Sequence, residues 1–72
     1  MISYEPLWET LKERNISIYK LINTYHISRG TIDNLKHDRS ITMSSLNQLM
    51  TTLQITDITE VIRYTPDNPD EK

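Results

Sequence analysis

The side chains with the clearest chemical capacity lie in residues 28–39, where polar and charged residues surround two apolar ones. The guanidinium of Arg29 can donate two hydrogen bonds to guanine O6 and N7, and the amide of Asn34 can pair in the same bidentate way with adenine N6 and N7. Thr31 can contact a thymine methyl group or a phosphate, and Asp33 can accept a hydrogen bond from cytosine N4. These residue types indicate recognition of base edges in the major groove of duplex DNA.

Helical periodicity predicts a helix over residues 28–37 that has Asp33 and Asn34 on its outward strip, with Arg29, Thr31 and Lys36 flanking that strip. At about 100° per residue, Ile32 and Leu35 point toward the core, and Gly30 and His37 lie almost opposite them. Glycine, threonine, aspartate and asparagine form helices poorly, whereas a helix face selected for stability favours alanine, glutamate and lysine. The composition therefore favours a binding face over the alternative, a polar face that is merely solvated.

Four further segments are predicted to support this helix. Ser17 caps a helix over 17–26, and only about three residues separate that helix from the next one. Such a tight corner is typical of the motif that sets its second helix into the major groove. Other helices are predicted over about 6–14, over 42–53, and after the capping residue 57. The sequence thus predicts an all-α protein, a compact bundle of about five short helices with a central helix-turn-helix.

The two ends of the chain leave an alternative open. Residues 61–64 alternate with a period of two, as do Ile2 and Tyr4, so the ends can pair in a short terminal β-ribbon. We take residues 1–65 as one helix-turn-helix domain. The remainder, 66–72, holds two prolines and no apolar side chain, and it is predicted to be a disordered acidic tail.

Charge is unevenly distributed along the chain, whose formal net charge is −2. Residues 12–39 hold six Lys and Arg against three Asp and Glu, a local net charge of +3. A polyanion can dock on this part of the chain, so double-stranded DNA is the predicted partner.

Several functional classes are excluded by what the sequence lacks. The chain has 72 residues, no cysteine and one glycine, which excludes thiol chemistry, thiolate metal sites and a glycine-rich phosphate loop. His26 and His37 have no neighbouring carboxylate triad, and one small domain hardly encloses a pocket. We therefore expect no metal, no cofactor, no enzyme activity and no small-molecule substrate. The N-terminus carries no secretory signal, and no run of about 20 apolar residues is present, so we expect a cytoplasmic protein outside membranes.

The chain contains SIYKLINTYHIS followed by RGTIDNLKHDRSITMSSLNQLMTTLQI, and over about residues 5–64 it resembles the Cro and phage-repressor type (XRE) helix-turn-helix family. Leu21, Ser28, Ile32 and Leu35 occupy the family's leucine, cap and paired apolar positions. The resemblance implies a lambda-repressor-like DNA-binding fold, sequence-specific binding to double-stranded DNA and, in most members, transcriptional repression.

By position, the resemblance also implies which residues contact DNA. Arg29 and Gly30 match the start of the recognition helix, Asn34 matches a base-contacting site one turn later, and Ser17 matches a phosphate clamp at the start of the second helix. The predicted base-contacting residues are Arg29, Gly30, Thr31, Asp33 and Asn34. The predicted contacts to the DNA backbone are Ser17, Lys20, Lys36, His37 and Arg39.

Three positions depart from the family pattern. The small residue usual in the second helix is Ile22, and we expect Gly30 to relieve the resulting crowding. His26 replaces the turn glycine, and Asp38 replaces the glycine after the recognition helix. Both residue types tolerate a positive φ better than most, so the helix ends are left open at these two positions.

Relatives in this family usually bind as two-fold dimers on inverted repeats, so we expect a homodimer through the C-terminal helix or a terminal ribbon, with a monomer as the alternative. The alternative function is a small helical protein interaction module without sequence-specific DNA binding. The salt dependence of binding affinity distinguishes the two functions, because binding to DNA weakens steeply with salt through counterion release.

Overall fold

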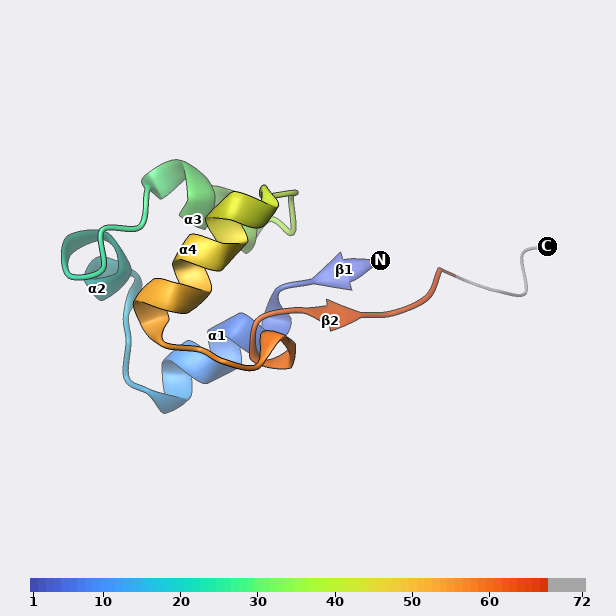
Figure 1. Cartoon of the computed structure of the whole chain (residues 1–72), viewed down its shortest axis with the longest axis horizontal. Helices are drawn as coiled ribbons and strands as arrows, with labels where there is room; N and C mark the ends of the chain where they lie inside the picture. Colours follow the sequence, from blue (N-terminus) through green and yellow to red (C-terminus); the bar gives the residue numbers. More distant parts are fainter. Residues whose placement is uncertain (68–72) are drawn as a thin grey trace.

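Four α-helices surround one core, and a two-stranded ribbon projects from the bundle, in the computed structural model, which describes residues 1–67 (Figure 1). The elements in chain order are β1 (Ile2–Ser3), α1 (Glu5–Glu13), α2 (Ile18–Asn23), α3 (Arg29–Lys36), α4 (Met43–Leu53), the 3-10 turn η1 (Ile58–Glu60) and β2 (Arg63–Tyr64). The predicted helical bundle with a central helix-turn-helix is confirmed. Most of the predicted acidic tail, residues 68–72, lies outside the described residues.

Side-chain caps begin α2, α3 and α4 at the predicted residues, whereas α1 begins without one. The hydroxyl oxygens of Ser17, Ser28 and Thr42 each accept a hydrogen bond of 3.0–3.1 Å from the backbone N–H three residues later. Asp57 begins η1 in a similar way, accepting from the hydroxyl and the N–H of Thr59. These two bonds stabilise the charged carboxylate and so lower the pKa of Asp57 below its usual value.

Residues in the left-handed region of φ follow each of the four α-helices. Asn15, His26, Asp38 and Gln54 have φ values of 56°, 59°, 54° and 58°. Each one turns the chain away from the helix axis toward the next element. The positive φ that the sequence allowed at His26 and Asp38 is therefore used at both positions.

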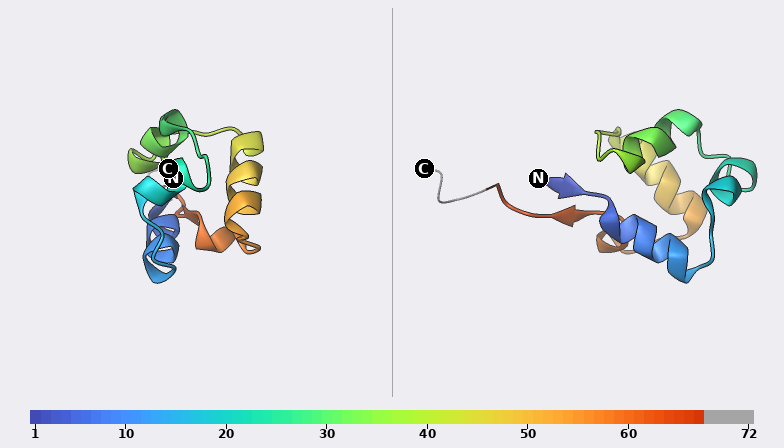
Figure 2. Two further views of the ribbon diagram at one scale, coloured as in Figure 1. Left: turned by 90° about the vertical axis from the view of Figure 1, so that its left-hand side faces the viewer. Right: turned by 180° about the vertical axis from the view of Figure 1, so that it is seen from behind.

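The core receives buried apolar side chains from every α-helix of residues 1–67. Leu7, Leu21, Leu35, Leu49 and Val61 are fully buried, and two further views show the helices packed around this common interior (Figure 2). Both residues predicted to anchor the third helix belong to the core. None of the helices in this part of the chain is long and apolar enough to cross a membrane.

A terminal ribbon replaces the predicted fifth α-helix, of which only the η1 turn remains. β1 pairs antiparallel with β2, with Ile2 opposite Tyr64. Beyond the ribbon, the carboxylate of Asp67 lies 3.1 Å from the amino group of Met1. The alternative left open for the chain ends is thus the one observed.

Ser28→Ala is expected to lower the free energy of unfolding by about 1 kcal/mol, because it removes the acceptor for an N–H in the first turn of α3. Urea denaturation followed by far-UV circular dichroism measures this change. Ser44→Ala, the same substitution at an exposed position of α4, is the control and should shift the value by less than about 0.5 kcal/mol. Equal stability of the two variants would show that the cap does not hold α3.

Candidate nucleic-acid interface

α3 is held by one narrow apolar stripe and leaves its opposite face in solvent. Ile32 and Leu35 are 3% and 0% exposed and attach the helix to the core. On the other side Gly30, Asp33 and His37 are exposed. Figure 1 shows α3 at the outer edge of the bundle, following directly on α2. The orientation predicted from periodicity is the one that the structure has.

Two hollows border the exposed face of α3, and some of the predicted contact residues line one hollow and some the other. Arg29 and Lys36 lie on the side toward α2, and Thr31 lies on the side toward α4. The hollow between α2 and α3, about 310 Å³, is lined by Ile18, Ile22, Arg29, Ile32, Asp33 and Lys36. The hollow beside α4, about 190 Å³, is lined by His26, Ile27, Ser28, Thr31, Ser45, Gln48 and Leu49.

Gly30 does not relieve crowding, so the reason predicted for this glycine is wrong. A Cβ atom built at Gly30 would meet no heavy atom within 4 Å outside its own helix backbone and chain neighbours. Its φ is not positive either, so the backbone accepts any L residue there. Ile22 instead lines the hollow toward α2. Neither packing nor backbone conformation in the free protein requires a glycine at this position.

The start of α3 is a closed hydrogen-bonded unit. Ser28 accepts from the N–H of Thr31 at 3.1 Å and donates from its hydroxyl to the hydroxyl oxygen of Thr31 at 2.9 Å. Thr31 is therefore held in one orientation beside Ser45 and Gln48 of α4. Ser45 and Gln48 were not among the residues predicted to contact DNA, although their spacing of three puts them on one face of α4.

The end of α3 carries a cluster of polar side chains that includes a residue from beyond the helix. Arg39 pairs with the carboxylate of Asp33 through Nη2 and donates from Nε to Oδ1 of Asn34 at 3.2 Å. His37 places Nδ1 at 2.9 Å from the backbone oxygen of Asp33 and at 3.4 Å from its carboxylate. Two predicted base-contacting residues and two predicted backbone contacts thus form one group on the exposed face.

The predicted phosphate contacts in α2 lie apart from this cluster. Ser17 uses its hydroxyl oxygen as the cap of α2, accepting from the N–H of Lys20 at 3.1 Å, and both side chains are exposed. Lys20 borders a hollow with Arg14 and the end of α4, whereas Ile18 and Ile22 border the hollow toward α3. The structure therefore does not bring Lys20 together with the residues of α3.

Residues 1–67 contain no group of three histidine, aspartate or glutamate side chains placed to hold a metal ion. The chemistry available on the exposed face of α3 is hydrogen bonding by a guanidinium, an amide and a carboxylate, flanked by the positive charges of Arg29 and Lys36. This combination suits a ligand that offers both negative charge and a pattern of donors and acceptors.

Comparison with known proteins identifies the domain. The family model of the Cro/C1-type HTH DNA-binding domain matches residues 6–67, which is most of the chain. Neither the curated proteins nor the solved structures gave a match. The matched span contains α2, α3 and α4, all of α1 except its first residue, and the polar cluster at the end of α3. The chain belongs to the Cro/C1-type helix-turn-helix family of DNA-binding domains.

Proposed function

We propose that this protein is a sequence-specific transcriptional regulator that inserts α3 into the major groove of double-stranded DNA. The observation that carries the proposal is the exposed face of α3 opposite Ile32 and Leu35, where a glycine and polar side chains stand in place of good helix formers. The major groove, about 12 Å wide, admits one α-helix whose first residues contact base edges. Repression follows where the bound protein covers a promoter.

The residues of the exposed face have distinct roles in this proposal. Arg29 pairs with guanine and Asn34 with adenine, each through two hydrogen bonds. Gly30 lets the helix backbone come close to the base edges. Thr31, oriented by the capping serine, meets a phosphate or a thymine methyl group. Asp33 lies on the same face but is paired with a positive charge, which limits its repulsion by the phosphates.

Contacts to phosphates complete the proposed interface. Ser17 and the N–H groups at the start of α2 donate hydrogen bonds to one phosphate, as helix starts commonly do. Lys36 and His37 lie exposed near the end of α3, within reach of the next part of the backbone. Lys20, on the side of α2 away from α3, adds positive charge at longer range.

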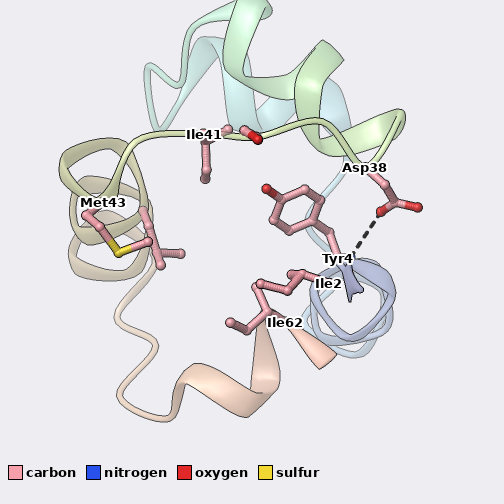
Figure 3. A pocket seen from close by; sticks show the side chains of 8 residues that line it. Ile2, Tyr4, Asp38, Ile41, Met43 and Ile62 are labelled. Carbon is pink, nitrogen blue, oxygen red and sulfur yellow. Dashed lines mark hydrogen bonds between the residues drawn. The ribbon is translucent and has the colours of Figure 1, made fainter. Parts of the chain in front are cut away.

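We also propose a homodimer that binds an inverted repeat, formed through the ribbon. Ile2 and Tyr64 are paired on one face of the ribbon and remain 52% and 68% exposed. The ribbon adjoins an apolar hollow of about 410 Å³ (Figure 3). This hollow is lined by Ile2, Tyr4, Asp38, Ser40, Ile41, Met43, Leu46 and Ile62. A two-fold axis would bring this patch against the same patch of a second copy and cover its exposed apolar side chains.

Selection of bound sequences from a randomised duplex pool tests the function and the dimer together. We expect one consensus site with two-fold symmetry. On the consensus duplex, Arg29→Ala should then weaken the binding free energy by about 1–3 kcal/mol and relax the preference at one base pair, because a bidentate contact is lost. Lys36→Ala, the matched control, should weaken all sequences alike and lower the slope of log affinity against log salt by about one.

The hollow beside the ribbon favours one other candidate, a helical module that binds a protein partner through apolar contacts. The duplex selection distinguishes the two. If all duplexes bind equally weakly at moderate salt, the DNA proposal is lost and the protein partner remains. A consensus without two-fold symmetry would keep DNA recognition and remove the homodimer.

A further inference from the structure

Arg39 lies beyond the end of α3, yet its side chain returns over the exposed face of that helix. Asp38 has a φ of 54°, which reverses the chain, and the N–H of Arg39 donates to the backbone oxygen of Asn34 at 2.8 Å. The guanidinium then lies between Asp33 and Asn34. At about 100° per residue these two positions flank the direction that points away from the core. Arg39 therefore occupies the face that would enter the groove.

The hydrogen bonds that the Arg39 guanidinium makes to Asp33 and Asn34 lie along one edge of this planar group and do not involve its other edge. Nε donates to Oδ1 of Asn34, and Nη2 pairs with the carboxylate of Asp33. These two nitrogens lie along the same edge of the planar group. No acceptor within residues 1–67 is hydrogen-bonded to Nη1 of Arg39. The second edge, made by Nη1 and the other hydrogen of Nη2, is the fork that fits guanine O6 and N7.

The backbone that carries Arg39 is fixed to the core through Tyr4. Tyr4 is 6% exposed, and its hydroxyl donates to the backbone oxygen of Arg39 at 2.8 Å. Its own N–H donates to the carboxylate of Asp38 at 3.1 Å (Figure 3). The loop between α3 and α4 is thus held at two consecutive residues. An arginine whose backbone and side chain are both held loses less freedom on binding than a free surface arginine.

We propose that Arg39 recognises a guanine in the major groove, with Asp33 and Asn34 as the residues that position it. The inference rests on the proposed function and replaces the phosphate contact predicted for Arg39. It also assigns Oδ1 of Asn34 to Arg39 in place of a bidentate contact to adenine. A phosphate needs only positive charge, and the paired carboxylate of Asp33 largely cancels that charge. A base needs a fixed direction, which the pairing supplies. The proposal also explains an aspartate on a face that meets a polyanion.

Binding titrations on the selected consensus duplex and its single base-pair variants test the proposal. Arg39→Ala should abolish the preference for one G·C pair, a loss of discrimination of roughly 5- to 150-fold at that pair. Arg39→Lys keeps the charge and should lose the same preference, because an ammonium group lacks the fork. Asp33→Ala should weaken discrimination at the same pair while binding to unrelated duplexes becomes tighter, since one negative charge is removed.

Lys36→Ala serves as the control, because it removes a positive charge of α3 without touching the cluster. Its affinity should fall on every duplex with the pattern of preferences unchanged. If Arg39→Ala behaves like Lys36→Ala, or if Arg39→Lys keeps the wild-type preferences, Arg39 is a phosphate contact and the inference is wrong. Unchanged discrimination in Asp33→Ala removes its positioning role. A wild-type protein without any preference among duplexes would overturn the proposed function as well, so the two failures are distinguishable.

Discussion

Leu35→Ala is expected to lower the free energy of unfolding by about 2–5 kcal/mol. Leu35 is 0% exposed, and with Ile32 it forms the narrow stripe through which α3 reaches the core. Small domains have only about 5–15 kcal/mol of total stability, and those of this size lie at the lower end. The variant should therefore retain at most a few kcal/mol of stability and unfold at a clearly lower temperature and urea concentration than the wild type. Thermal and urea denaturation followed by far-UV circular dichroism measure the loss.

Tyr19→Ala provides the control for this truncation. Tyr19 is a large side chain of α2 that is 74% exposed. Its truncation should change the free energy of unfolding by less than about 0.5 kcal/mol. A loss below about 1 kcal/mol in Leu35→Ala would contradict the close packing of α3 against the core. In that case the exposed face of α3 would not be held rigidly enough to recognise bases.

Local signals were sufficient to predict where α3 and α4 begin, because the residues that cap these helices lie next to their first turns. Ser28 and Thr42 are capping residues, and each caps its helix as expected. Asp38 tolerates the left-handed conformation, and it ends α3 in that conformation. Apolar spacing then fixed which face of each helix is buried. The exposed face of α3 could therefore be predicted from the sequence.

Of the two boundaries that the sequence left open, one is set by local backbone contacts and the other by pairing between the two ends of the chain. α2 ends at Asn23, before the predicted 26, because the N–H of Ile27 closes back onto the oxygen of Leu21 at 2.9 Å and His26 adopts a positive φ. The last predicted helix is reduced to a single turn because the chain pairs with β1 directly afterwards. Pairing between the two ends of a chain depends on the whole fold, so the period-two pattern could only suggest it.

The cluster around Arg39 was beyond sequence reasoning for a similar reason. Its geometry depends on the hydrogen bond from Tyr4 to the backbone of Arg39, two residues that are 35 positions apart. Helical periodicity describes neighbours within one helix and gives no information about a side chain that returns from the following loop. The predicted roles of Asp33 and Asn34 were therefore assigned without the residue that holds both of them.

Gly30→Ala is expected to raise the stability of the protein, by up to about 1 kcal/mol. The gain follows from two observations, since the added Cβ meets nothing within 4 Å and the backbone of Gly30 is not in the left-handed region. Alanine also restricts the unfolded chain more than glycine does. Thr51→Ala, at an exposed position of α4, is the matched control, since it too replaces a poor helix former with alanine.

The methyl group that Gly30→Ala adds is expected to weaken binding to the consensus duplex by tenfold or more, because it stands between the helix backbone and the base edges. Holding α3 away from the groove weakens the neighbouring bidentate contacts, each worth about 1–3 kcal/mol. Thr51→Ala should bind like the wild type, so the comparison separates stability from recognition in one titration series. If Gly30→Ala is more stable and binds with unchanged affinity, the backbone at Gly30 does not approach the bases. A glycine that costs helix stability and is not needed for packing is explained only if that approach takes place.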